Sequence, residues 1–288
     1  MINKNTKAFI CGIKGKSLSN NEKKFLVKYK PWGIILFSRN IDTIKQTQEL
    51  TKSIKKLFKN YNYPILIDEE GGRVSRLKKF IDNSIFTAKF FGDMYDKNPK
   101  KFYLYFNIYI KQISHLLKKL GININTVPVL DIRRKNFHQI IGDRSFSTNK
   151  NKVKKIGDFC INNFYKNKIG TVIKHIPGHG LAKVDSHKKL PIVNKNLNYL
   201  LKNDFSTFKK NKSLMAMTGH LLFKKIDNEN TSTLSKKIVD IIRNKIQFKN
   251  IIITDDLSMK ALKNDLKNNV LDSFKAGCNI VLHCNGNF

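Results

Sequence analysis

Short apolar runs alternate with longer amphipathic stretches along the whole chain. Eight apolar runs bounded by turn-forming residues predict β-strands at 8–13, 33–40, 64–70, 125–132, 170–180, 213–220, 250–256 and 279–284. Between the strands, apolar residues recur three or four positions apart, with lysines on the opposite side. This pattern predicts helices, among them 21–30, 43–59, 153–168 and 235–246.

The alternation of strand and helix predicts an α/β fold. Near-continuous apolar strands joined by helices form parallel sheets covered by helices, and eight such units close into a TIM (β/α)8 barrel. Such a barrel takes about 250 residues, so a single domain over residues 1–288 is expected. A doubly wound open sheet is the alternative. Because only four residues follow the last strand, the final helix is expected to be missing or shortened.

Six of the predicted strands end in residues capable of chemistry. The carboxyl ends of barrel strands surround the active site of TIM-barrel enzymes. In the barrel these six side chains are therefore expected to converge: Arg39, Asp68, Asp131, His175, His220 and Asp255.

Composition and charge narrow the class of protein. Hydrophobic residues make up 41% of the chain, enough for a full core. The formal net charge of +34 would favour a nucleic-acid partner, but the lysines are spread along the chain and no nucleic-acid-binding motif accompanies them. We attribute them to A- and T-rich codons and expect no specific nucleic-acid partner; a basic RNA-binding protein remains the non-enzymatic alternative.

The chain has no apolar run of signal-peptide or membrane-span length, and its four cysteines form no CxxC pair. A cytoplasmic protein with reduced cysteines and no membrane partner is expected.

Three of the seven histidines lie within residues 174–191. Pro177 and Gly178 prevent a regular helix there, so His175 and His179 are not the helical pair that binds zinc, and no metal is expected. Asp185 and His187 stand two apart, a spacing at which a carboxylate can fix an imidazole toward a substrate. The alternative is a loop whose histidines only satisfy backbone groups.

Two further segments bring carboxylates to strand ends. In IIITDDLSM, Asp255 lies nearer the strand end and is assigned to chemistry, whereas Asp256 is assigned to capping the following helix. In ILIDEEGGRVSRL, the paired glycines permit a tight turn, and Asp68 either contacts a ligand or forms a salt bridge with Arg73 or Arg76.

Taken together, these segments resemble the bacterial β-N-acetylhexosaminidases of glycoside hydrolase family 3 that act in peptidoglycan recycling. The similar motifs run through nearly the whole chain: GIILFSRN, DEEGGRV, PVLDI, GDRSF, KHIPGHG, DSH, AMTGH, TDDLSM and AGCNIVLHCN. KHIPGHG and DSH are the most specific. Gly219 departs from the family's usual alanine in AMTGH.

The resemblance implies a retaining glycosidase without a metal or other cofactor. It implies Asp255 as the nucleophile and His187 as the general acid/base, assisted by Asp185. It places sugar binding at Asp68, Arg76, Arg144, Lys174 and His175. The implied substrate is a cytosolic muropeptide, a GlcNAc-1,6-anhydroMurNAc peptide, from which terminal β-linked N-acetylglucosamine is removed. A glycoside phosphorylase or a β-glucosidase of the same family remains an alternative.

Overall fold

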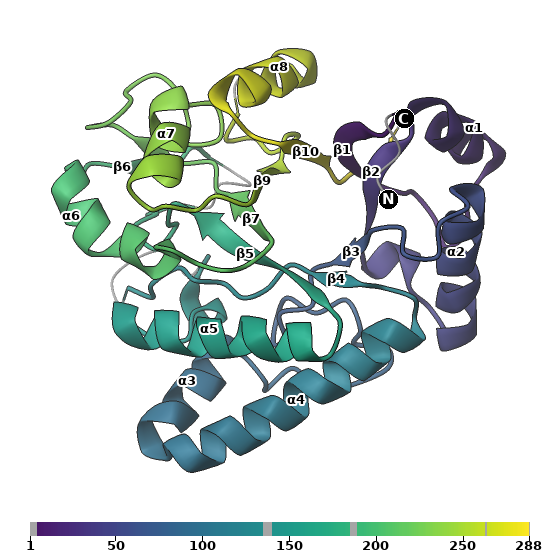
Figure 1. The fold of residues 1–288 in the computed structure, drawn as a ribbon, viewed down its shortest axis with the longest axis horizontal. Helices are drawn as coiled ribbons and strands as arrows, with labels where there is room; N and C mark the ends of the chain where they lie inside the picture. The colour runs from purple at the N-terminus through teal and green to yellow at the C-terminus, as the bar shows by residue number, and fades with distance from the viewer. Residues whose placement is uncertain (1–4, 135–139, 185–188, 263, 288) are drawn as a thin grey trace.

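The computed structural model describes residues 5–134, 140–184, 189–262 and 264–287. Eight parallel strands close into a barrel in the order β1-β10-β9-β7-β5-β4-β3-β2 (Figure 1). Their bounds are β1 Lys7–Gly12, β2 Pro31–Leu36, β3 Ile65–Ile67, β4 Ile124–Asn125, β5 Gly170–Ile176, β7 Met215–Thr218, β9 Ile251–Asp256 and β10 Ile280–His283. Each predicted strand has a counterpart, but the range predicted for the fourth, 125–132, is wrong, because β4 shares only Asn125 with it. The prediction of a TIM barrel is confirmed.

Helices connect the strands and surround the barrel (Figure 1). They are α1 Asn20–Tyr29, α2 Ile44–Leu57, α3 Ala88–Lys97, α4 Pro99–Lys119, α5 Lys150–Lys166, α6 Leu197–Lys202, α7 Lys236–Asn244 and α8 Leu266–Ala276. The four helices predicted by segment correspond to α1, α2, α5 and α7. Local chemistry sets their starts: before α1, the Ser19 hydroxyl accepts from the Glu22 amide while the Glu22 carboxylate accepts from the Ser19 amide.

Pairing of the first strand with the last distinguishes the closed barrel from an open sheet. Phe9 pairs with Val281 and Cys11 with His283 in parallel register between β1 and β10. The inward side chains form a compact interior core that includes Ile10, Ile35, Leu66, Val172 and Ile253. This closure excludes the doubly wound alternative and gathers all eight strand ends on one rim.

Two features lie outside the regular barrel pattern. A two-stranded parallel sheet of β6 (Ile192–Val193) and β8 (Leu222–Phe223) was not predicted, because two-residue strands carry no periodic signal. After β10, no helix follows within the described residues. Among the described residues, none of the helices combines the length and the hydropathy that a membrane span requires.

Candidate active site

A pocket of about 190 Å³ opens at the carboxyl end of the barrel strands. Six residues assigned from the sequence line it together: Asp68, Arg76, Arg144, Lys174, His175 and Asp255. The remaining lining side chains include Glu70, Arg73, His179, Met217, Leu282 and Cys284. Asp185 and His187, assigned as the acid/base pair, lie outside the described residues.

The turn after β3 depends on the paired glycines predicted to form it. Gly71 and Gly72 have φ values of +90° and +60°, a region that side-chain-bearing residues rarely adopt. A Cβ atom on Gly71 would also lie 2.3 Å from the Phe86 carbonyl oxygen. Asp68 and Glu70 both stand between the end of β3 and this turn, and both line the same pocket.

Buried ion pairs join the walls of the pocket. Glu70 accepts two hydrogen bonds of 2.8 Å from Arg144 and contacts Lys174 Nζ at 2.7 Å. Asp68 contacts the same Lys174 Nζ at 3.1 Å and Arg76 at 3.2 Å. Asp68 therefore both lines the pocket and forms the salt bridge that the sequence offered as an alternative, with Arg76 and not with Arg73. Arg73 pairs with Asp143 at 2.8 Å.

The ion pairs determine the charge state of the pocket. Burial alone would raise the pKa values of Asp68 and Glu70, but the neighbouring cations outweigh it. Lys174 and Arg76 hold the pKa of Asp68 well below its usual range, and Arg144 and Lys174 lower that of Glu70 to about 2. Burial likewise opposes the charge of Arg144, yet the Glu70 carboxylate raises its pKa. All three groups are therefore charged at neutral pH.

Asp131 does not line the pocket itself but holds His175 and His179, which do. It is fully buried and accepts from the backbone amides of His175 at 3.2 Å and His179 at 2.6 Å. Burial lowers the pKa of His175 to about 3 and that of His179 to about 4. Because burial raises the pKa of Asp131 only to about 6, Asp131 is ionised and His175 neutral at pH 7. His175 Nδ1, 2.7 Å from Asp131, is thus assigned the proton, which leaves Nε2 for a ligand.

The consecutive carboxylates at the end of β9 have different surroundings. Asp255 lines the pocket. Asp256 accepts from the backbone amides of Ser258 at 3.1 Å and Cys284 at 3.2 Å. Asp256 thus serves in capping, but the expectation that it caps a helix is wrong. It caps a turn, and the N-cap of α8 is Asp265.

The expected convergence of six strand ends is only partly correct. Asp131 lies behind the pocket, and neither Arg39 nor His220 lines it. His220 is fully buried, with Nδ1 2.7 Å from the Thr233 hydroxyl and Nε2 3.0 Å from the Asp256 carbonyl oxygen.

Arg39 closes the rim of the barrel instead of lining the pocket. Its guanidinium donates to the carbonyl oxygen of Ile13 at 2.9 Å and to that of Cys284. It therefore bridges the segments that follow the first and last strands.

Sequence reasoning assigned no site role to three further residues that line the pocket, Glu70, Arg73 and His179. Glu70 and His179 stand within the quoted motifs DEEGG and KHIPGHG, but neither was assigned to the site. A usable signal was the position of Glu70, two residues beyond Asp68 at the same strand end. For His179, the spacing of residues in KHIPGHG does not indicate whether the histidine lines a pocket or is buried within a loop.

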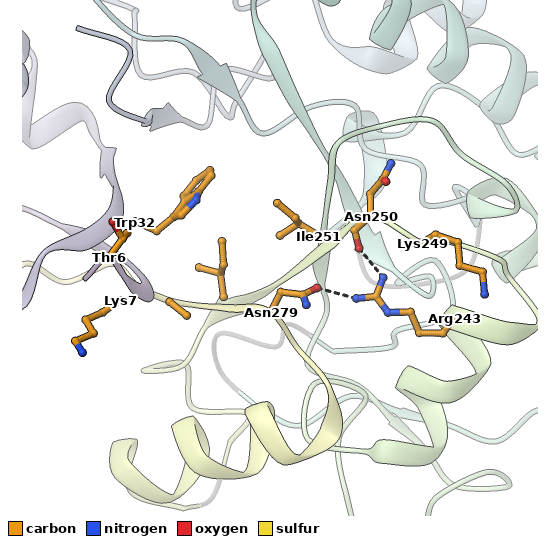
Figure 2. A pocket seen from close by; sticks show the side chains of 10 residues that line it. Thr6, Lys7, Trp32, Arg243, Lys249, Asn250, Ile251 and Asn279 are labelled. Atoms are coloured by element: carbon orange, nitrogen blue, oxygen red, sulfur yellow. Dashed lines mark hydrogen bonds between the residues drawn. The ribbon is translucent and has the colours of Figure 1, made fainter. Parts of the chain in front are cut away.

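A larger hollow of about 550 Å³ lies at the opposite, amino end of the strands, around Trp32 and Ile251. Figure 2 shows Arg243 in this hollow bonded to Asn250 and Asn279. The distances are 2.5 Å from Arg243 Nη1 to the Asn250 carbonyl oxygen and 2.7 Å from Nη2 to Asn279 Oδ1. These contacts tie loops together, and none of the residues assigned to chemistry lines this hollow. The smaller pocket is therefore the candidate active site.

The described residues include no group of three or more His, Cys, Asp or Glu side chains arranged to hold a metal ion. The chemistry available from the described pocket is that of an ionisable carboxylate, fixed cations and a neutral imidazole.

Comparison with known proteins identifies the family. Residues 8–288 match the glycosyl hydrolase family 3 N terminal domain. The β-hexosaminidase of Nitrosomonas eutropha is 30% identical over 283 residues, which cover 95% of this chain and 79% of that protein. The β-hexosaminidase of Neisseria meningitidis serogroup A is 32% identical over 279 residues, covering 93% and 75%.

Solved structures agree with this match. The structure of NagZ from Neisseria gonorrhoeae in complex with N-trifluoroacetyl-D-glucosamine superposes with a TM-score of 0.88 at 30% identity, covering 97% of this chain and 82% of that one. A family 3 β-N-acetylglucosaminidase from Paenibacillus superposes with a TM-score of 0.86 at 25% identity, covering 96% and 53%. The barrel, its carboxyl-end pocket and these matches together show that the chain belongs to glycosyl hydrolase family 3 and is a glycosidase.

Proposed function

We propose that the chain is a retaining β-N-acetylglucosaminidase. It removes non-reducing terminal β-linked N-acetylglucosamine from GlcNAc-1,6-anhydroMurNAc peptides in the cytoplasm, with residues 1–288 as one catalytic domain. The β-hexosaminidase relatives support the sugar class. The observation that carries the proposal is the placement of Asp255 in one small pocket with Asp68, Arg144, Lys174 and His175.

The first step forms a covalent glycosyl-enzyme. A carboxylate oxygen of Asp255 attacks the anomeric carbon as the bond from that carbon to the leaving oxygen breaks. His187, oriented by Asp185, gives its proton to the leaving oxygen.

The second step hydrolyses this ester. Water attacks the anomeric carbon, His187 takes a proton from the water, and the Asp255 carboxylate departs. Two displacements at the same carbon retain its configuration.

The remaining pocket residues bind the sugar. Asp68 accepts from sugar hydroxyls, and Arg76, Arg144 and Lys174 donate to sugar oxygens. His175 is neutral at working pH, so its free Nε2 accepts a hydrogen bond and adds no positive charge. No cofactor takes part in this scheme.

Hydrolysis of 4-nitrophenyl N-acetyl-β-D-glucosaminide, beside the corresponding glucoside, tests the proposal. We expect release of nitrophenol from the N-acetyl sugar and little from the glucoside, with free N-acetylglucosamine as product whether or not phosphate is present. Preference for the glucoside would indicate a β-glucosidase. A sugar 1-phosphate formed on adding phosphate would indicate a phosphorylase. No turnover of either sugar, with RNA bound at physiological salt, would favour the non-enzymatic alternative.

A further inference from the structure

Glu70 joins two buried cations of the pocket and uses both of its carboxylate oxygens to do so. Its side chain is 6% exposed, and its two oxygens contact Arg144 and Lys174 at 2.7 to 2.8 Å. The cations are themselves buried, with side-chain exposures of 12% for Arg144 and 3% for Lys174. Neither the sequence motifs nor the comparisons assign it a role.

We propose that Glu70 is a positioning residue of the glycosidase, which holds the Arg144 guanidinium and the Lys174 ammonium in place against the sugar. This inference rests on the proposed function only in that Arg144 and Lys174 bind the sugar. Glu70 itself acts through these two cations.

The geometry of the Arg144 pair supports this role. Arg144 donates through Nε to one oxygen of Glu70 and through Nη2 to the other, each at 2.8 Å. A planar guanidinium bonded to both oxygens of a carboxylate is fixed in orientation as well as in distance. The edge of the guanidinium that does not face Glu70 is thereby set at a defined angle.

Lys174 needs a second partner to hold its position. Its Nζ lies between Glu70 at 2.7 Å and Asp68 at 3.1 Å, and also bonds the Thr126 hydroxyl at 2.9 Å. Like charges repel strongly in a poorly solvated site. Without the Glu70 carboxylate, the positive charges of Lys174 and Arg144 would lie near each other, and Asp68 would be the one carboxylate left in contact with Lys174 among the described residues.

Glu69, the residue before Glu70, is a carboxylate with a structural role. Glu69 is 2% exposed and accepts from the backbone amides of Arg76 at 2.7 Å and Leu77 at 3.1 Å and from Asn83 Nδ2 at 2.5 Å. These bonds anchor the loop. Glu69 forms no ion pair with any described residue, whereas Glu70 pairs with two cations that line the pocket.

The test is Glu70→Gln, measured as kcat and KM for the nitrophenyl N-acetyl sugar alongside the urea midpoint of unfolding. Glutamine keeps the size but presents an NH₂ group toward donors. Misplaced binding cations should raise KM tenfold or more and lower kcat/KM on the order of a hundredfold. A merely structural role would instead reduce the active fraction, so that apparent kcat falls while KM stays unchanged. An unchanged KM overturns the proposal.

Glu70→Asp serves if Glu70→Gln does not fold. Aspartate keeps the charge but is one methylene shorter, so it cannot span both cations, and KM should still rise severalfold. An unchanged KM in Glu70→Asp also overturns the proposal.

Asp42→Asn is the matched control. Asp42 also joins two cations, Lys16 and Lys79, but at a partly exposed position outside the pocket, and we expect kcat and KM of the variant within threefold of the parent. A parent enzyme inactive on every β-glycoside would refute the proposed function before any variant is compared, so the two failures are distinct.

Discussion

The Asp255 carboxylate accepts a hydrogen bond of 2.8 Å from the backbone amide of Asp256, the residue that follows it. That bond holds the Asp255 carboxylate in a fixed direction at the strand end. The carboxylate of Asp256 accepts from Ser258 and Cys284 instead. Of these two adjacent aspartates, Asp255 lines the pocket and Asp256 stabilises the turn that follows β9.

This division predicts different outcomes for the two alanine variants. Asp255→Ala should reduce turnover about ten-thousandfold or more, because Asp68 and Glu70, the other carboxylates that line the pocket, are held in ion pairs. Asp256→Ala should retain measurable turnover and lower the free energy of unfolding by about 2 kcal/mol through loss of its turn contacts. Steady-state rates and urea unfolding of both variants check this; comparable loss of turnover in both would contradict it.

His187→Ala should show a loss that depends on the leaving group. A sugar alkoxide needs a proton as it departs, whereas nitrophenolate does not. Cleavage of a disaccharide substrate should slow about a hundredfold or more, and formation of the glycosyl-enzyme from the nitrophenyl sugar should slow far less. Asp185→Ala should show the same bias more weakly. Pre-steady-state rates on both substrates make the measurement, and equal slowing would mean that His187 positions the substrate.

Acid should destabilise the fold through His175 and His179. Burial lowers their pKa values from 6.5 to about 3 and about 4. Between about pH 6.5 and 4 the unfolded chain therefore binds more protons at these sites, and the free energy of unfolding falls as pH falls. Each histidine contributes about 1.36 kcal/mol per pH unit in that window.

Asp131 opposes this trend. Burial raises its pKa from 3.8 to about 6, so between those values the folded state binds the extra proton, and this contribution to stability is lost as pH rises. Burial also raises the pKa values of Glu69, Asp158 and Asp204, so the prediction concerns the difference between a histidine variant and the parent. Urea unfolding at pH 7 and pH 5 should show a smaller loss in His179→Asn than in the parent; an equal loss would mean that His179 does not titrate on unfolding.

Arg39→Ala should weaken the barrel and leave sugar binding largely intact. Arg39 bonds the carbonyl oxygens of Ile13 and Cys284, and loss of charged hydrogen bonds of this kind costs about 2 kcal/mol. We expect a lower melting temperature and a KM within threefold of the parent. A tenfold change in KM without a change in melting temperature would place Arg39 in the binding site.

Chelators should leave the activity unchanged, since the proposed scheme assigns no step to a metal. Dialysis against EDTA, followed by assay with and without added zinc, checks this. Activity lost to EDTA and restored by zinc would give the histidines a ligand role.

The sequence predicted the barrel because each strand is an apolar run that is buried on both faces. The barrel interior buries one face, as at Ile35, and the surrounding helices bury the other, as at Ile34 and Ile173. It predicted less of the site, because a strand-end position does not specify which way a side chain points. Arg39 satisfies backbone carbonyls and His220 a threonine, and both look like site residues by position alone. Glu70, in contrast, does line the pocket but was not assigned to it. Its ion-pair partners are Arg144 and Lys174, which lie far along the chain, so no local sequence pattern shows these contacts.

Trapping the glycosyl-enzyme tests the central claim most directly. A slowly turned over fluorinated N-acetylglucosaminyl substrate is incubated with the parent protein, which is then digested and mapped by mass spectrometry. We predict one sugar adduct per chain, located on Asp255. An adduct on Asp256, or no covalent adduct from a substrate that the enzyme demonstrably cleaves, would contradict the account.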